Sequence, residues 1–487
     1  MNIKKTYRLF FSIAIILAIF QTYSCKPKVE EENKKVVILA VNDMHANIDN
    51  FPRFAFIVDS LREIYPDLLL VSAGDNQSGN PANDQYPQKG MPITELMNMI
   101  KFDVCAVGNH EFDTKQDGFK YIIDNSKFDY ISANIKPSSN LGLNIKPFKT
   151  IKMPNGLKIA FTSVISLNEN GIPDSHPNNL TDIKFTDPFT TAKDYLYLKD
   201  EHDLLIFVNH FGFEEDVELA EQFPKGKVDL IIGGHSHTVV EKEQIFNDIL
   251  ITQAGNKLKY CTLIELEVEK DYSVKKSMKL IPINKNGEII AEFQEKVDEY
   301  NDSPFLNEKI AEAEDDFTSY EQVGYLMGDA LRLNLNTDIA VVNPGGVRID
   351  KLDKGDINVR DVYSMDPFGN EAVIFNLTGN EIKAMYLSAF TIDEYLPIYP
   401  SGIKVKYILK DKKTIKDVIF YTESGEDLDM EKTYSVAMNN YMASVYNYEH
   451  ADSGTGQFVT TAENMIDYLK NLETVPSYKN EKRVELK

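Results

Sequence analysis

The sequence predicts an α/β protein with two domains, and three observations lead to this prediction. Apolar runs typical of buried strands alternate with amphipathic helical stretches over residues 35–290. A charged stretch with helical periodicity follows at 291–316, and a second unit with its own strands and helices occupies 317–487. The length of 487 residues also exceeds what a single domain usually contains.

Residues 1–25 are predicted to be an export signal rather than part of the fold. The basic residues Lys4, Lys5 and Arg8 precede an apolar core, Phe10–Phe20, which is too short to span a bilayer. We expect no later stretch to cross a membrane.

The end of this segment, Thr22-Tyr23-Ser24-Cys25, resembles the cleavage site of bacterial lipoproteins. The resemblance implies an exported protein that is anchored to a membrane only through a lipid on Cys25. Lys26 after the cysteine favours the outer membrane, facing the periplasm or the cell surface, with residues 26–34 as a polar tether. The alternative is an ordinary secretory signal that happens to contain a cysteine.

Composition excludes some partners. The net charge of −23, without a basic stripe, argues against a nucleic-acid polymer, although a small anionic substrate is compatible with bound cations. Cys105 and Cys261 lie in apolar runs and are interpreted as small buried side chains, which could form a disulfide but need not. We expect a monomer.

Five strand-like runs each lead directly into residues that bind metals. They are Val36–Val41 into Asn42-Asp43-Met44-His45, Leu68–Ser72 into Gly74-Asp75-Asn76, Val104–Val107 into Gly108-Asn109-His110-Glu111-Phe112-Asp113, Leu204–Val208 into Asn209-His210, and Leu230–Ile232 into Gly233-Gly234-His235-Ser236-His237. Because ligands of α/β sheets bind beyond the carboxyl ends of the strands, we expect these side chains to converge. The predicted metal ligands are Asp43, His45, Asp75, Asn109, His210, His235 and His237.

The types and spacing of these residues favour two cations. Asp43 and His45 are two residues apart, as are His235 and His237, so each pair would face one side of an extended chain. Asp75 supplies a carboxylate that can bridge two ions. A water between two such ions would lose a proton near neutral pH and could attack phosphorus. Zn, Mn, Fe, Co and Ni all suit these ligand types.

His110 is predicted to act in catalysis rather than as a ligand. Asp113 is placed to orient its ring and keep it protonated, and a cationic imidazole beside the metals would stabilise a transferring phosphoryl group. The alternative is a His–Asp pair that only supports the loop. The three histidines outside these motifs are interpreted as surface or loop residues, namely His176, His202 and His450.

The order of these motifs resembles that of the calcineurin-like metallophosphoesterases, and more closely the bacterial 5′-nucleotidase family, which includes UDP-sugar hydrolases. The resemblance implies a four-layer β-sandwich flanked by helices over 35–290. A helix over 291–316 would join it to a smaller α/β (α+β) substrate-binding domain over 317–487. It also implies two divalent metal ions, Zn, Mn or similar, and hydrolysis of a small phosphorylated substrate, a 5′-nucleotide.

Several carboxyl-terminal motifs extend the resemblance. The turn Asn343-Pro344-Gly345-Gly346-Val347-Arg348 matches one whose Arg contacts the anionic end of the substrate. Asp366-Pro367-Phe368-Gly369-Asn370 and Asn440-Tyr441 match the two aromatic walls of a base-stacking slot. The substrate-binding residues that this implies are Asn343, Arg348, Phe368 and Tyr441.

Two departures weaken the match. Ser319 stands where the family has its first substrate-binding arginine, and Ser444–His450, with Asn447 at a carboxylate position, replaces a glycine-rich segment. Two alternatives to nucleotidase activity therefore remain. One is the same chemistry on 2′,3′-cyclic nucleotides or UDP-sugars, and the other is a surface lipoprotein that binds ligands without turnover.

Overall fold

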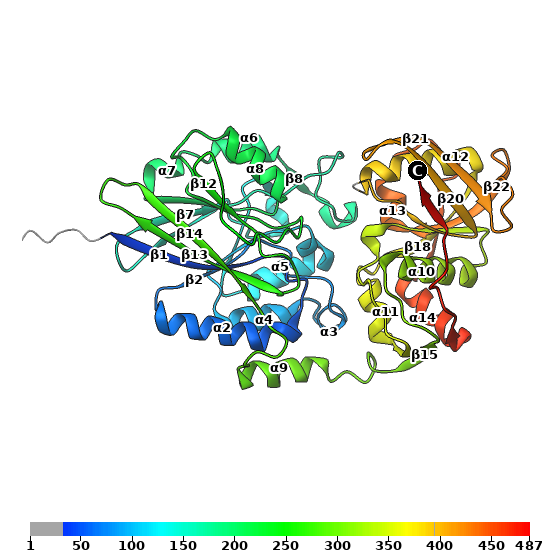
Figure 1. Cartoon of the computed structure of the whole chain (residues 1–487), viewed down its shortest axis with the longest axis horizontal. Coiled ribbons are helices and arrows are strands. Elements are labelled where there is room, and N and C mark those ends of the chain that lie inside the picture. Colours follow the sequence, from blue (N-terminus) through cyan, green and yellow to red (C-terminus); the bar gives the residue numbers. More distant parts are fainter. Residues whose placement is uncertain (1–32, 394) are drawn as a thin grey trace, which may run out of the picture.

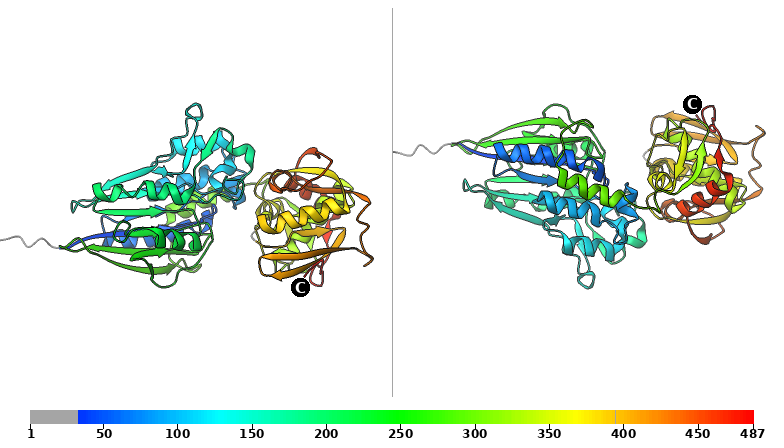
Figure 2. Two further views of the ribbon diagram at one scale, coloured as in Figure 1. Left: turned by 90° about the horizontal axis from the view of Figure 1, so that it is seen from above. Right: turned by 90° about the horizontal axis from the view of Figure 1, so that it is seen from below.

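The computed structural model describes residues 33–393 and 395–487, so the predicted signal and Cys25 lie outside the described residues. Two domains lie side by side along the long axis of the molecule (Figures 1 and 2). The described part of the chain contains no helix that is both long enough and apolar enough to cross a membrane. Cys105 and Cys261 are buried free thiols and form no disulfide.

The amino-terminal domain contains two six-stranded sheets. In sheet order, the strands of the first are β14 (Val274–Pro282), β13 (Tyr260–Val268), β1 (Lys34–Val41), β2 (Leu69–Ser72), β3 (Val104–Ala106) and β4 (Asp129–Ile131). Those of the second are β11 (Gln244–Phe246), β12 (Ile249–Thr252), β10 (Leu230–Ile232), β9 (Leu204–Val208), β7 (Lys158–Thr162) and β6 (Phe148–Lys152). The central strands of both sheets are parallel.

The two sheets pack face to face and helices cover their outer faces. In β1, Val36, Ile38 and Ala40 lie in the core between the sheets, whereas the alternate residues Val37 and Leu39 pack under helices. The helices over the first sheet are α2 (Phe51–Ile64), α4 (Met91–Ile100), α5 (Lys115–Asn125) and α9 (Ala291–Asn301). Those over the second are α6 (Pro188–Asp194), α7 (Leu198–Glu201) and α8 (Phe213–Gln222). The predicted four-layer fold is confirmed.

Short elements complete this domain beside the sandwich. They are α3 (Pro81–Asp84) and the two-stranded pair β5 (Ile135–Pro137) and β8 (Ile183–Phe185).

The prediction of helical structure over 291–316 was wrong in its extent. The helix α9 ends at Asn301, and Pro304 soon after it disfavours helical backbone in the residue before it. Residues 309–313 form strand β15 instead. In addition, Phe293 and Val297 of α9 lie in the core of the first domain, so this helix packs against α2 rather than bridging freely.

The carboxyl-terminal domain is built from three small sheets and five helices among the described residues. The sheets are β17 (Gly355–Asn358), β15 (Lys309–Ala313) and β24 (Thr474–Val475); β19 (Tyr399–Ser401), β16 (Ile339–Val342), β22 (Thr433–Asn439), β18 (Glu371–Thr378) and β23 (Thr455–Thr460); and β21 (Thr414–Thr422), β20 (Ile403–Asp411) and β25 (Val484–Leu486). The helices are α10 (Tyr320–Leu335), α11 (Val359–Met365), α12 (Gly379–Ile392), α13 (Asn440–Val445) and α14 (Thr461–Leu472). This domain has its own apolar cores.

Candidate metal centre

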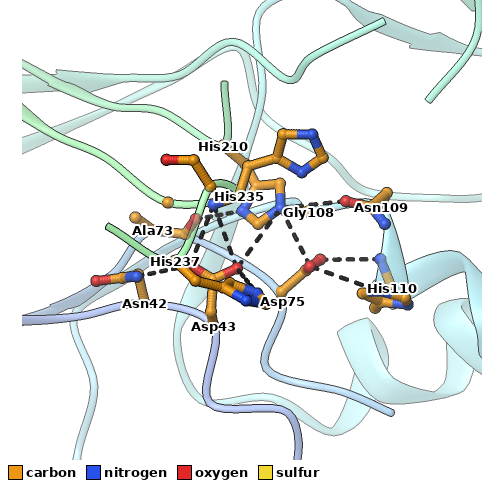
Figure 3. Close-up of polar contacts among 12 residues, drawn as sticks. Asn42, Asp43, Ala73, Asp75, Gly108, Asn109, His110, His210, His235 and His237 are labelled. Carbon is orange, nitrogen blue, oxygen red and sulfur yellow. Dashed lines mark hydrogen bonds and ion pairs between the residues drawn. The ribbon is translucent and has the colours of Figure 1, made fainter. Parts of the chain in front are cut away.

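The loops that follow five strands meet at one end of the amino-terminal domain (Figure 3). Strands β1, β2 and β3 come from the first sheet, and β9 and β10 come from the second. The predicted ligands therefore converge because two facing sheets end at the same place, and not from one sheet alone.

Asp43, His45 and His237 form the first group of potential ligands, with their metal-binding atoms within 4.8 Å of one another. The Nε2 atoms of His45 and His237 are 3.0 Å apart, and His237 Nε2 lies 3.4 Å from Asp43 Oδ1. Such separations fit atoms that bind one cation at about 2.0–2.2 Å. His45 Nδ1 lies 3.1 Å from the Ser78 carbonyl oxygen, which directs Nε2 toward the centre.

Asp43, Asp75 and His210 form a second group. His210 Nε2 is 3.2 Å from Asp75 Oδ2 and 3.2 Å from Asn109 Oδ1, while His210 Nδ1 lies 2.8 Å from the Ala73 carbonyl oxygen. Asp43 belongs to both of these groups, and a third group of His45, Asp75 and His110 also joins them, so the ligand set is continuous. Its oxygen and nitrogen donors fit divalent transition metals.

The buried carboxylates of the centre are stabilised by positive charge nearby. The side chains of Asp43 and Asp75 are buried. Burial opposes protonation of His210, but Asp75 outweighs it and raises the pKa of His210 to about 10. Burial likewise opposes ionisation of Asp75, but His210 and His110 hold the pKa of that carboxyl well below its usual range. Divalent cations would neutralise the same buried charge.

The backbone of several predicted ligands is left-handed. The φ angles are 49° at Asp43, 46° at His45, 52° at Asp75, 79° at His235 and 54° at His237. The prediction that each ligand pair faces one side of an extended chain was therefore wrong, because the chain turns sharply after the strand. Such residues cost roughly 1–3 kcal/mol each and cluster at functional sites.

His235 is the one predicted ligand among the histidines that belongs to none of these groups within the described residues. Its ring lies edge-on to that of His210, with the centroids 5.0 Å apart, and its backbone N–H donates to the Asp43 carboxylate at 3.1 Å. A role of His235 as a ligand stays a prediction.

His110 and Asp113 form the predicted pair. His110 Nδ1 lies 2.7 Å from Asp113 Oδ2, and His110 Nε2 lies 3.9 Å from Asp75 Oδ2. Burial lowers the pKa of His110, but Asp75 and Asp113 outweigh burial and raise it. Both carboxylates thus favour the protonated imidazole, and the Asp113 contact to Nδ1 leaves Nε2 directed at the centre. The His110 backbone N–H separately donates to Asp75 Oδ1 at 2.9 Å.

Glu111 is a residue that the sequence reasoning missed. Its fully buried carboxylate accepts hydrogen bonds from the backbone N–H groups of Asp75, Asn76 and Gly108 at 3.0, 2.8 and 2.6 Å. Burial, followed by the charge of Asp75, raises the pKa of Glu111 to about 7. Glu111 therefore joins the loops that carry Asp75 and Asn109. The position of Glu111 inside a motif with three predicted site residues, Asn109, His110 and Asp113, was the available signal.

Gly108 allows its loop to pack closely against the loop that carries Asp75. A Cβ atom at this position would lie 2.2 Å from Asp75 Oδ1 and 2.5 Å from the Asp75 backbone nitrogen. Any side chain here would displace the Asp75 carboxylate, so the glycine is required for the packing of the two loops.

A cleft of about 260 Å³ runs from the metal-binding residues to the carboxyl-terminal domain. The predicted substrate-binding residues Asn343, Arg348, Phe368 and Tyr441 all line this cleft. The Phe368 ring is nearly parallel to that of His110, with centroids 5.6 Å apart, and the Arg348 guanidinium lies 5.6 Å from the Phe368 centroid. Arg348 Nη2 also lies 3.4 Å from His45 Nε2. The second domain therefore completes the site.

The two departures from the family motifs have structural roles here. Ser319 is the N-cap of α10, where its hydroxyl accepts from the Gln322 N–H at 3.3 Å. The Asn447 backbone N–H donates to the Ser388 hydroxyl at 2.9 Å.

The three remaining histidines lie outside helices and strands, as predicted for surface or loop residues, although one of them is buried. His202 is buried between Leu198 and Thr150 rather than at the surface, with ring-nitrogen contacts of 2.8 and 2.9 Å. His176 lines the 260 Å³ cleft. His450 is exposed, as predicted.

Comparison with protein families decides the identity of the two domains. Residues 36–239 match the model of the calcineurin-like phosphoesterases, and residues 307–461 match that of the 5′-nucleotidase carboxyl-terminal domain. The chain belongs to the 5′-nucleotidase family of calcineurin-like phosphoesterases. It is a metal-dependent phosphoester hydrolase.

Individual relatives of this family cover most of the chain. Protein UshA of Escherichia coli is 27% identical over 508 residues, which are 88% of this chain and 90% of that protein. Endonuclease YhcR of Bacillus subtilis is also 27% identical, over 95% of this chain, but the chain spans only 42% of that relative's length. The fold matches that of a 5′-nucleotidase precursor from Thermus thermophilus with a TM-score of 0.81 at 24% identity, covering 93% of this chain and 99% of that one.

Proposed function

We propose that this phosphohydrolase removes phosphate from nucleoside 5′-monophosphates with the help of two divalent cations. The observation that carries this proposal is the cleft that joins the metal-binding residues to two aromatic side chains of the other domain, Phe368 and Tyr441. Two rings of this kind can hold a purine or pyrimidine by its faces.

The proposed metal ligands divide according to the two groups. His45 and His237 would bind one cation, His210 and Asn109 the other, and the carboxylates of Asp43 and Asp75 would contribute to both. His235 completes the proposed set. When bound here, divalent cations supply an activated water and neutralise phosphate charge.

His110 is proposed to stabilise the phosphate during the reaction. Its protonated ring faces the centre, and Asp113 holds it in that orientation. A cation fixed at this place stabilises the charge that develops on the phosphoryl oxygens without having to reorganise. Arg348 is a second fixed cation beside the centre and would contact the same phosphate.

The substrate is tested by comparing AMP with glucose 6-phosphate. We expect kcat/KM to be higher for AMP by roughly 5- to 150-fold, because stacking contributes about 1–3 kcal/mol per base. Tyr441→Ala should remove this preference while leaving hydrolysis of p-nitrophenyl phosphate nearly unchanged. Phe368→Ala would also remove the ring that packs on His110, so the two variants test different contacts. Equal rates for both substrates in the wild type would refute the nucleotidase assignment.

We also propose that the protein is exported and anchored through a lipid on Cys25. The support is the order of basic residues, apolar core and Ser24-Cys25 in the sequence. Cys25→Ser should release the protein from the membrane fraction, and mass spectrometry of the mature wild-type amino terminus should find acyl chains. An unmodified terminus would rule out the anchor.

A further inference from the structure

The loop that carries Phe368 runs from Asp366 to Asn370, and both Phe368 and Asn370 line the 260 Å³ cleft. Thr461, the first residue of α14, holds both ends of this loop. Its hydroxyl donates to the Asp366 carboxylate, and its backbone N–H donates to the Asn370 carbonyl oxygen at 2.8 Å. A Cβ atom at Gly369, the exposed tip, would meet nothing within 4 Å, so the backbone of the loop is restrained at its ends.

The Asp366 carboxyl is buried among apolar side chains, and Met327 and Met465 line a small cavity beside it. Burial raises the pKa of Asp366 to about 6, whereas hydrogen bonds from the Thr461 hydroxyl and the Phe368 backbone N–H lower it. The carboxyl is therefore mainly ionised at a pH of about 7.5, and both bonds belong to the strong, charge-assisted kind. A bond from an Asp side chain to the N–H two residues later is also typical of a turn.

The second aromatic wall is joined to the same loop. Asn440, directly before Tyr441, accepts a hydrogen bond through its Oδ1 atom from the Glu371 backbone N–H at 3.2 Å, one residue after the end of the loop. Polar contacts of this loop therefore connect the Phe368 wall to the Tyr441 wall. Two rings can stack on one base only at a defined separation, so contacts that fix the loop affect the affinity for a nucleoside.

We propose that Asp366 and Thr461 are positioning residues that hold the Phe368 wall in the place that a nucleoside base requires. Neither residue lines the 260 Å³ cleft, so they act through Phe368 and Asn370, which do. This inference rests on the proposed function, which makes Phe368 a wall for the base. Holding a binding wall in place before the substrate arrives lowers the cost of binding and leaves the chemical step unchanged.

Thr461→Val tests the contact in the full-length protein loaded with metal, because valine has the shape of threonine without its hydroxyl and keeps the backbone N–H. We expect KM for AMP to rise about 3- to 10-fold, since part of the free energy of one charge-assisted hydrogen bond is lost. The kcat for AMP and the kcat/KM for p-nitrophenyl phosphate should stay within about twofold of wild type. Thr461→Ser keeps the hydroxyl and should retain the wild-type KM.

The matched control is Thr460→Ala, one residue earlier. The Thr460 hydroxyl caps α14 by accepting from the Glu463 N–H at 3.1 Å. Its removal should lower the Tm but leave KM for AMP unchanged, because the Thr461 contacts remain. An equal rise of KM in Thr460→Ala would assign the effect to the stability of α14 and overturn the inference. If Thr461→Val does not fold, Asp366→Asn makes the same test, since it keeps the side-chain shape and removes the charge.

A second measurement needs no substrate. The chain contains no tryptophan, so Phe368→Trp introduces a single indole into the loop. Adding Thr461→Val to this variant should raise the quenching of its fluorescence by acrylamide at least about twofold, because the loop opens more often to solvent. Adding Thr461→Ser or Thr460→Ala should leave the quenching unchanged.

The outcomes separate the two proposals. Unchanged quenching, or an unchanged KM for AMP in an enzyme that prefers AMP over glucose 6-phosphate, overturns the positioning role of Asp366 and Thr461. Increased quenching together with equal rates on AMP and glucose 6-phosphate in the wild type overturns the nucleotidase proposal instead and leaves the anchoring of the loop standing.

Discussion

Glu111 is a single residue that ties together the two loops carrying Asp75 and Asn109. Its carboxylate accepts three backbone N–H groups from two loops, so Glu111→Gln would turn an amide donor toward groups that need an acceptor. We expect metal affinity to fall about 10- to 100-fold with the fold intact. Metal content after dialysis and circular dichroism measure the two effects. Glu63→Gln, on the exposed side of α2, is the control.

Full metal occupancy and an unchanged rate in Glu111→Gln would show that backbone geometry alone holds Asp75 in place. Loss of the fold would instead assign Glu111 a general structural role.

His110 should separate catalysis from metal binding. His110→Asn removes the imidazole but keeps the backbone N–H that donates to Asp75, so the metal ligands stay in position. We expect kcat to fall by roughly 10²–10³-fold with metal content unchanged. If the variant loses metal, His110 belongs to the ligand set and its proposed role is wrong.

Sequence motifs identified the residues of the centre but not their supporting contacts. The predicted ligands are recognisable because each follows a strand directly. The partners of Glu111 could not be predicted, since Asp75 and Asn76 are 35 or more residues away and contribute backbone groups, which any residue type provides. The left-handed backbone at Asp43 and His45 was hidden for a similar reason, because nothing in these residue types requires it.

The carboxyl-terminal strand β25 pairs with β20, and an ion pair largely shielded from solvent fixes the start of β25 to α10. Arg483, directly before β25, donates to both oxygens of Asp329 on α10 at 2.6 and 2.8 Å. Burial raises the pKa of Asp329, but Arg483 outweighs this and lowers it. Arg483→Met should destabilise the protein by about 3–5 kcal/mol at pH 7, because a buried carboxylate loses its counterion. Urea unfolding measures this change.

The same pair predicts a dependence on pH. Because the folded pKa of Asp329 is depressed, its contribution is present above the unfolded value of about 4 and is lost as the pH falls through the folded value. The difference between wild type and Arg483→Met should therefore shrink in acid. Lys487→Met, at the exposed chain end, should change little at either pH. A difference that is independent of pH would contradict the ion-pair account.

Helices and strands were predicted where the pattern is local and missed where it is not. The apolar periodicity of Phe293, Val297 and Tyr300 correctly indicated a helix, but its end depends on Pro304 and on the pairing of β15 with β17 and β24. The separation of the five metal-bearing strands into two sheets also depends on strand pairing, which the sequence pattern alone does not specify.

The molecule joins a metal-binding domain to a second domain that completes the substrate cleft. The relative placement of the domains brings Arg348 beside His45 and forms the cleft that Phe368 and Tyr441 line. The family motifs predicted that Arg348, Phe368 and Tyr441 would serve the site.

Chelation should therefore affect the two domains unequally. The buried carboxylates Asp43 and Asp75 lie in the amino-terminal domain, so removing divalent cations with EDTA should lower the unfolding temperature of that domain and leave the carboxyl-terminal one nearly unchanged. Cations at 100 times their Kd stabilise the folded state by about 2.7 kcal/mol. Scanning calorimetry with and without added Mn²⁺ measures the shift, and Asp75→Asn should reduce it. Equal shifts of both domains would mean that the cations act through the interface, and no shift in wild type would contradict the metal centre itself.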